Sequence, residues 1–225
     1  MKNKLGQEIY AILYKEILSE FRTRYSISTI LLFILTTITM IALALVSERM
    51  GAELSAGLLW IVIFFASMIG LSKSFVSEEE RGTAFLLQVF SSSTAIYFGK
   101  LIFNVLLSIF INFFSLVLFF LFANAKTVAS PNELIIIILI SSLAVATSTT
   151  IISAIISKAS SKNALFPVLS FPILLPIIKL GIDLTVSAFI GTTFNAILSD
   201  LQLIIAYIGL ITTISYLLFD FIWKD

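Results

Sequence analysis

Long apolar stretches, most of them about 20 residues in length, recur along almost the whole chain. A helix rises 1.5 Å per residue, so about 20 apolar residues cross the roughly 30 Å hydrocarbon core of a bilayer. The chain has 225 residues, of which 59% are hydrophobic and only 12% are charged, and its mean hydropathy is +1.10. A soluble domain of this length cannot bury so much apolar surface. The pattern predicts an all-α integral membrane protein.

We predict six transmembrane helices within one domain that covers residues 1–225, with five or seven as the alternatives. The expected spans are 27–47, 54–72, 101–123, 134–157, 164–180 and 201–223. Segment 184–194 is also apolar but is too short to span, so we expect an interfacial or re-entrant piece there.

The first 26 residues predict an amphipathic helix that lies in the membrane interface. One face carries Ile9, Leu13, Ile17 and Phe21, with Tyr10 and Tyr14 beside them, and the opposite face carries Glu8, Lys15, Ser19 and Arg22. Leu5 and Ile12 fall outside this apolar stripe. An amphipathic membrane anchor is favoured over a specific partner site.

Lysine and arginine are distributed unequally between the two sets of loops. Eleven of the fourteen lie in the N-terminal segment, in 73–100, in the 158–163 loop or at the C-terminus. The other three are Arg49, Lys126 and Lys179. Because cytoplasmic loops carry the excess of positive charge, both termini and segment 73–100 are predicted to be cytoplasmic.

Several enzyme classes are excluded by composition. The chain has no histidine and no cysteine, so it has no Ser-His pair, no His-x-x-x-His zinc motif and no thiolate metal site. Its one Gly-Lys pair, Gly99-Lys100, lacks the other residues of a phosphate-binding loop. We expect no enzymatic activity, no bound metal and no directly bound cofactor. The net charge of +1 also argues against nucleic acid as a partner.

Two spans contain features that point to helix packing or to a cavity. Asn104, Ser108, Asn112 and Ser115 share one face of the third span, which favours hydrogen bonds between helices over a cavity lining. The fifth span contains three prolines, so we expect it to be kinked or broken. Such a helix acts either as a bent packing element or as a hinge that lines a cavity. The prolines are Pro167, Pro172 and Pro176.

The densest polar run of the chain follows the second span. Glu78, Glu79, Glu80 and Arg81 precede Gly82, and an apolar group follows at once. That group includes Phe85, Leu86, Val89 and Phe90. This order predicts a short helix with exposed aromatic residues beside a charged rim, which is typical of a protein contact. Ser91–Thr94 then provides a cap for the helix that enters the third span.

These segments together resemble the haem exporter protein B family, the membrane subunits of the cytochrome c maturation haem exporter, which are ABC-2 type permeases. The resemblance covers nearly the whole chain. It is carried by Leu59-Trp60-Ile61-Val62, by the amphipathic N-terminal segment, by Arg81-Gly82-Thr83 with Leu87, and by the 171–176 stretch Phe-Pro-Ile-Leu-Leu-Pro. Members of the family often have a proline-rich turn where this chain has Ser91–Thr94.

The resemblance implies a homodimer in the bacterial inner membrane that engages two copies of a separate ATP-binding cassette subunit. It also implies haem-handling membrane subunits as further partners. In the family the segment after the second span docks on the ATPase, which places that coupling role here on residues 78–90. The aromatic group at 85–90 is expected to make the contact, and the acidic run is expected to form its rim.

The expected function is that of a permease subunit that couples ATP hydrolysis in a partner to haem export, or to release of a haem-loaded component. Haem is then a substrate. Without histidine it would be held by apolar walls, by Met40, Met50 or Met68, or by partner subunits. Two alternatives are an ABC-2 exporter of a lipid, glycan or drug, and a membrane assembly scaffold that transports nothing.

Overall fold

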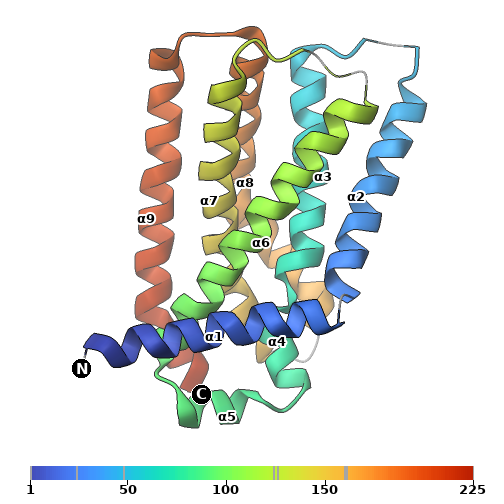
Figure 1. The fold of residues 1–225 in the computed structure, drawn as a ribbon. Coiled ribbons are helices and arrows are strands. Elements are labelled where there is room, and N and C mark those ends of the chain that lie inside the picture. Colours follow the sequence, from blue (N-terminus) through green and yellow to red (C-terminus); the bar gives the residue numbers. More distant parts are fainter. Residues whose placement is uncertain are drawn as a thin grey trace.

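The structure is a computed structural model, which describes residues 2–23, 25–47, 49–123, 125, 127–159 and 162–224. Every regular element in these residues is a helix. Figure 1 shows long helices packed side by side, with another helix lying across the lower end of the bundle. Six helices in the described part are long and apolar enough to cross a membrane, which confirms the predicted architecture. The chain is a multi-pass membrane protein.

The helices take up different positions in the bundle. The crosswise helix is α1, α5 is a short helix at the same end, and α3 and α4 run on from one another with only Ser72 between them. In chain order the elements are α1 (Lys2–Thr23), α2 (Tyr25–Ala44), α3 (Ala52–Leu71), α4 (Lys73–Glu80), α5 (Ala84–Phe90), α6 (Ser93–Phe122), α7 (Pro131–Ser157), α8 (Lys162–Ile190) and α9 (Phe194–Lys224).

Helix α7 forms the centre of the bundle. In the apolar membrane-crossing stretch of α7, 72% of the residues are buried, compared with 17% in the same kind of stretch in α2 and in α9. It packs against α3, α4, α6, α8 and α9. Several of its hydroxyl side chains, including Thr149 and Thr150, donate hydrogen bonds to carbonyl oxygens three or four residues earlier in the same helix. These small, internally satisfied side chains allow the neighbouring helices to approach closely.

Helices α3 and α8 touch at a glycine. The Trp60 indole packs against Gly181, where an added Cβ atom would lie 2.0 Å from Cζ2 of the ring. The indole nitrogen also donates a 3.0 Å hydrogen bond to Thr185 Oγ1, and both side chains are buried. A buried indole N–H needs such an acceptor, so this bond fixes the position of the ring on α8.

The fifth span differs from its predicted form. Helix α8 is continuous from Lys162 to Ile190 and contains all three prolines, so of the two predicted forms, kinked or broken, the broken one is wrong. The prediction of a separate interfacial or re-entrant piece at 184–194 is also wrong. Lys179 Nζ contacts both carboxylate oxygens of Asp183 at 2.5–2.6 Å, one helical turn away, so the two charges pair on the surface of the continuous helix.

Both ends of the chain and the α4–α5 segment lie at the same end of the bundle (Figure 1). The α2–α3, α6–α7 and α8–α9 connections lie at the opposite end. This arrangement agrees with the predicted grouping of the loops. Arg24 and Lys126, two residues used for the predicted orientation, lie outside the described residues.

Helix α1 docks on the bundle through a residue outside the predicted stripe. Ile12 is 3% exposed and packs on Gly99 of α6, where an added Cβ atom would lie 2.7 Å from Ile12 Cγ2. Tyr10, Tyr14 and Phe21, by contrast, are exposed. Helix α1 therefore packs on α6 through Ile12, while Tyr10, Tyr14 and Phe21 face outward.

Candidate functional site

An exposed apolar surface covers one side of α5. The side chains of Phe85, Leu86, Val89 and Phe90 are between 53% and 77% exposed, and we call these four residues the α5 patch. Ala84 on the same helix is buried. Because α5 lies at the end of the bundle, beyond α1 in Figure 1, its patch is presented away from the transmembrane helices.

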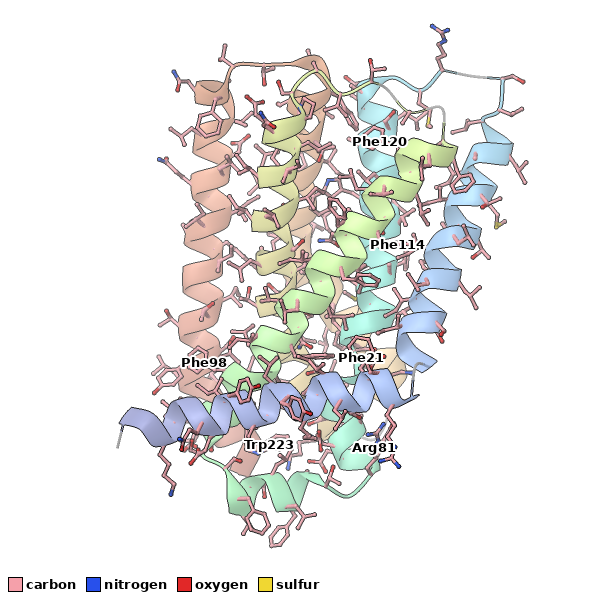
Figure 2. The ribbon with its side chains drawn as sticks, in the orientation of Figure 1. Phe21, Arg81, Phe98, Phe114, Phe120 and Trp223 are labelled. Atoms are coloured by element: carbon pink, nitrogen blue, oxygen red, sulfur yellow. The ribbon has the colours of Figure 1, made fainter. Side chains whose placement is uncertain are left out.

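The other side of α5 is attached to the bundle. Leu87 packs against the smaller of two hydrophobic clusters, and Gln88 donates a hydrogen bond to the backbone carbonyl of Trp223 in α9. Figure 2 labels Trp223 near the lower end of the bundle. The Trp223 ring is fully buried and packs on Phe219 and Phe75, with ring centroids 5.9 and 5.3 Å away. This aromatic packing joins α4 to α9, and Leu87 and Gln88 attach α5 beside it.

A tight turn connects α4 to α5. Gly82 has φ of 68°, a left-handed conformation that favours glycine, and an added Cβ atom there would meet nothing within 4 Å. The backbone N–H of Thr83 donates a 2.9 Å hydrogen bond to the Glu78 carbonyl, and the Thr83 hydroxyl donates to the Glu78 carboxylate. The turn thus fixes the direction of α5 relative to α4.

Beside this turn lies a group of four charged side chains, which we call the ion cluster: Lys15, Glu16, Glu78 and Lys100. Lys100 Nζ lies 2.6 Å from Glu16 Oε1 and 3.1 Å from Glu78 Oε1. It also donates to the Ser74 carbonyl at 2.6 Å, and its side chain is 0% exposed. Lys15 contacts both carboxylates from the more exposed side.

The ion cluster connects three helices, since its members come from α1, α4 and α6. Two cations balance two carboxylates, so no net charge is buried. Removing one partner from such a buried pair is costly because the other charge is left without compensation. The cluster therefore fixes the docking of α1 and α4 on the base of α6.

Three weaker contacts surround the ion cluster. Glu8 of α1 accepts hydrogen bonds from the backbone N–H and the hydroxyl of Ser92, at 3.2 and 2.8 Å, and these bonds lower the pKa of its carboxyl group. Ser92 also caps α6 by accepting from the Ala95 N–H, which confirms the predicted cap. Glu79 pairs with Lys158 at the end of α7, with a separation of 3.3 Å.

The predicted coupling residues separate into two groups in the structure. Glu80, Arg81 and Gly82 are exposed, as are the four residues of the α5 patch. Glu78 is 4% exposed and bound within the chain, so the prediction that the acidic run forms a rim is wrong for this residue. The sequence pattern used Lys100 for the orientation of the chain but did not indicate its ion pairs, because Glu16 and Glu78 lie 84 and 22 residues away.

The polar face of the third span packs against α7. Asn104 Nδ2 donates a 2.8 Å hydrogen bond to Thr150 Oγ1, and Asn112 Nδ2 donates a 2.7 Å bond to Ser142 Oγ. Both asparagines are fully buried. These contacts are the interhelical hydrogen bonds that the spacing favours. Asn104 additionally lines a polar cavity of about 250 Å³.

The residues considered for a hinge or for haem lie apart from the ion cluster. Pro167, Pro172 and Pro176 are all exposed on α8, and Pro167 also lines a shallow groove with Met68. Met50 is buried, whereas Met40 is 70% exposed. The described residues contain no group of three or more histidine, cysteine, aspartate or glutamate side chains placed to hold a metal ion.

Comparison with known families agrees with the resemblance drawn from the residues. The family model described as "CcmB protein" matches residues 7–218, which is nearly the whole chain. The match includes α1 from its second turn, the ion cluster, the α5 patch and most of α9. No curated protein sequence matches the chain. The chain belongs to the CcmB family, the haem exporter protein B of cytochrome c maturation.

Proposed function

We propose that this chain is the transmembrane subunit through which a separate ATP-binding cassette subunit drives haem export, or release of a haem-loaded component, in cytochrome c maturation. Membership of the CcmB family supports a membrane component of that process. The observation that carries the coupling role is the α5 patch, an exposed apolar surface on a helix that Leu87 and Gln88 attach to the bundle.

The chemistry of the patch suits a protein partner. Phe85 and Phe90 are 70% and 77% exposed, and large aromatic side chains of this kind are typical anchors at protein interfaces. Glu80 and Arg81 provide polar side chains nearby. A soluble ATPase that receives the patch in an apolar groove removes apolar surface from water. This burial is favourable by about 25 cal/mol per Å².

The attachment of α5 gives the contact a mechanical consequence. A force applied to α5 reaches α4 through the Gly82 turn, α9 through Gln88, and α1 and α6 through the ion cluster. These are stiff, short-range contacts between packed elements. Movement of the ATPase is thereby passed to several membrane helices together.

The same proposal specifies the assembly and its place in the cell. The chain forms a homodimer in the bacterial inner membrane, with both termini and α5 on the cytoplasmic side, where the positive-inside rule places them. Each chain engages one ATPase subunit, and haem-handling membrane subunits complete the complex. Haem is bound by those partners, which explains why a chain without histidine serves the process.

Co-purification tests the coupling role. The double substitution Phe85→Asp with Phe90→Asp should abolish recovery of the ATPase with the tagged chain, because it places two charges in an apolar contact. The matched control is Phe85→Leu with Phe90→Leu, which keeps the surface apolar and should retain the ATPase. Equal recovery of the ATPase with the aspartate variant would refute the docking role, provided that the chain is present in membranes at the normal amount.

A deletion strain tests the process. Loss of this chain should abolish holo-cytochrome c while apocytochrome is still exported, and normal haem attachment would contradict the proposal. An ATPase subunit that cannot hydrolyse ATP should have the same effect. If haem attachment instead survives without hydrolysis, the chain is a scaffold, and if only a lipid, glycan or drug is retained in the cell, it is an exporter of another class.

A further inference from the structure

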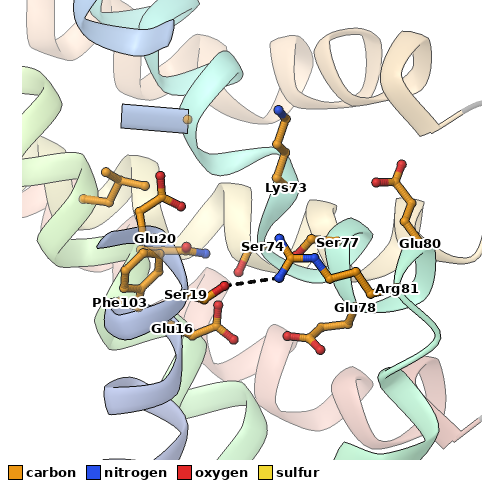
Figure 3. A pocket seen from close by; sticks show the side chains of 13 residues that line it. Glu16, Ser19, Glu20, Lys73, Ser74, Ser77, Glu78, Glu80, Arg81 and Phe103 are labelled. Carbon is orange, nitrogen blue, oxygen red and sulfur yellow. Dashed lines mark hydrogen bonds between the residues drawn. The ribbon is translucent and has the colours of Figure 1, made fainter. Parts of the chain in front are cut away.

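A polar cavity of about 250 Å³ lies between α1, the α3–α4 junction and α6. Figure 3 shows its side chains, with Arg81 reaching across to Ser19. The Arg81 guanidinium donates a 3.2 Å hydrogen bond to Ser19 Oγ there. Side chains of both charges line the cavity, the cations Lys73 and Arg81 and carboxylates that include Glu20 and Glu80. It therefore suits a ligand that carries both charges.

Two buried oxygen atoms at this cavity have no hydrogen-bond partner among the described residues. They are Asn104 Oδ1 and Ser74 Oγ, on side chains that are 1% and 8% exposed. The amide nitrogen of Asn104 is already used, because it donates to Thr150. The amide oxygen can only accept, and because Asn104 lines the cavity, a donor bound there can satisfy it.

An apolar cavity of about 370 Å³ adjoins the polar one. The two share the lining residues Glu20, Phe103 and Leu107, and the apolar cavity continues along Leu106 and Phe110 of α6. Leu106 and Phe110 are 50% and 42% exposed, on a helix that crosses the membrane. This cavity therefore opens on the side of the bundle where lipid acyl chains lie.

We propose that the two cavities together bind one phospholipid whose head group carries a primary ammonium beside its phosphate, that is, phosphatidylethanolamine. The ammonium donates to Asn104 Oδ1 and Ser74 Oγ and is balanced by the cavity carboxylates. The phosphate contacts Arg81 and Lys73. The acyl chains follow the apolar cavity past Phe103. A primary ammonium has three N–H donors, so it can donate to both unpartnered oxygen atoms and to a carboxylate.

Other amphipathic molecules fit less well. The quaternary ammonium of phosphatidylcholine has no N–H group and leaves the Asn104 oxygen unsatisfied. A purely anionic lipid brings no cation to the carboxylates. Haem brings two propionates but no ammonium, and the carboxylates of the cavity that lie outside the ion cluster are Glu20 and Glu80. Like charges in one site repel each other, so haem is disfavoured here.

Native mass spectrometry of the full-length chain, purified with its complex from membranes and equilibrated with equal amounts of the two zwitterionic lipids, tests this site. Phosphatidylethanolamine should be retained about tenfold more than phosphatidylcholine, the ratio expected for one unsatisfied buried acceptor. Asn104→Leu should remove this preference. Asn112→Leu is the matched control, because Asn112 makes the same kind of bond to α7 and does not line the cavity.

A second variant keeps the test decisive if Asn104→Leu fails to accumulate. Glu80→Gln with Lys73→Gln changes exposed side chains and should lower retention of phosphatidylethanolamine by about tenfold. Equal retention of both lipids, retention unaffected by these variants, haem in place of lipid, or a cavity that holds water alone would each overturn the proposal. The readout is bound lipid, so it is independent of ATPase docking and of haem attachment.

Discussion

Lys100 Nζ lies 2.6 Å from Glu16 Oε1, and this ion pair joins the base of a transmembrane helix to the crosswise α1 helix 84 residues earlier in the chain. The lysine side chain is 0% exposed, and the glutamate side chain is 11% exposed. The pair thus determines where the N-terminal helix sits. It also places α1 beside α4, because the same ammonium contacts Glu78.

We expect Lys100→Met to lower the free energy of unfolding by about 3 kcal/mol, since Glu16 and Glu78 would lose their buried partner. Denaturant titration of the purified chain in mixed micelles measures this change. Lys158→Met is the matched control. It breaks the more exposed pair with Glu79 and should cost less than about 1 kcal/mol. Equal losses in the two variants would contradict the importance of the ion cluster.

A companion variant separates the ion pair from side-chain packing. Combining Lys100→Met with Glu16→Gln and Glu78→Gln removes the buried carboxylates along with the ammonium. Because no uncompensated charge remains, the triple variant should be more stable than Lys100→Met alone. A triple variant that is less stable by the sum of the single losses would show that the three residues act independently.

Gly181→Ala should destabilise the contact between α3 and α8 by about 1–3 kcal/mol, because its methyl group would overlap the Trp60 ring. The same denaturant titration measures the effect. Gly209→Ala in α9 is the matched control, since an added Cβ there meets nothing within 4 Å. That change should be neutral or stabilising by a few tenths of a kcal/mol, through the higher helix propensity of alanine.

Gly82→Ala should lower the free energy of unfolding by about 1 kcal/mol, and the reason is the backbone conformation at this position. Its φ of 68° is unfavourable for a residue with a Cβ atom, although there is space for the atom itself. Gly82→Asn should cost less, because asparagine adopts this conformation more readily. Limited proteolysis between α4 and α5, compared across the two variants, measures the loosening of the turn. Identical cleavage rates would contradict this account.

Stability at low pH should depend on Glu8. The hydrogen bonds from the backbone and side chain of Ser92 hold the pKa of the Glu8 carboxyl below its ordinary value. The stabilisation from these bonds is therefore fully present above the ordinary carboxyl pKa, and it is lost as the pH falls through the lower folded value. Amide hydrogen exchange at residues 92–95, followed from pH 7 downward, should show this loss. Glu8→Gln should remove that dependence, and an unchanged profile in the variant would contradict it.

The sequence predicted the overall architecture because its signal is local. Apolar runs of about 20 residues determine which segments can cross a bilayer, and the amphipathic pattern of residues 5–25 determines which helix cannot. The short helix with its exposed aromatic residues was also predictable, since the Gly82 break and the α5 patch are contiguous in the chain. The cap at Ser92 follows from the same local chemistry.

The fifth span shows where local reasoning fails. Three prolines and the charges of Lys179 and Asp183 argue against one continuous helix, yet α8 runs to Ile190. Packing against α3 and α7 supports the helix from the side, and the pairing of Lys179 with Asp183 offsets their charges. The pairing follows from the four-residue spacing of the two charges, whereas the packing depends on neighbouring helices that a pattern of residue types does not specify.

The sequence by itself determined that this is a six-span membrane protein with an amphipathic N-terminal helix and an apolar patch between its second and third spans. Only the tertiary structure decided which charges become internal. Glu78 belongs to an acidic run that is expected to be exposed. It is buried because Lys15 and Lys100, which lie 63 and 22 residues away in the chain, both contact its carboxylate. Burial of a charge requires a partner, and folding alone brings that partner into place.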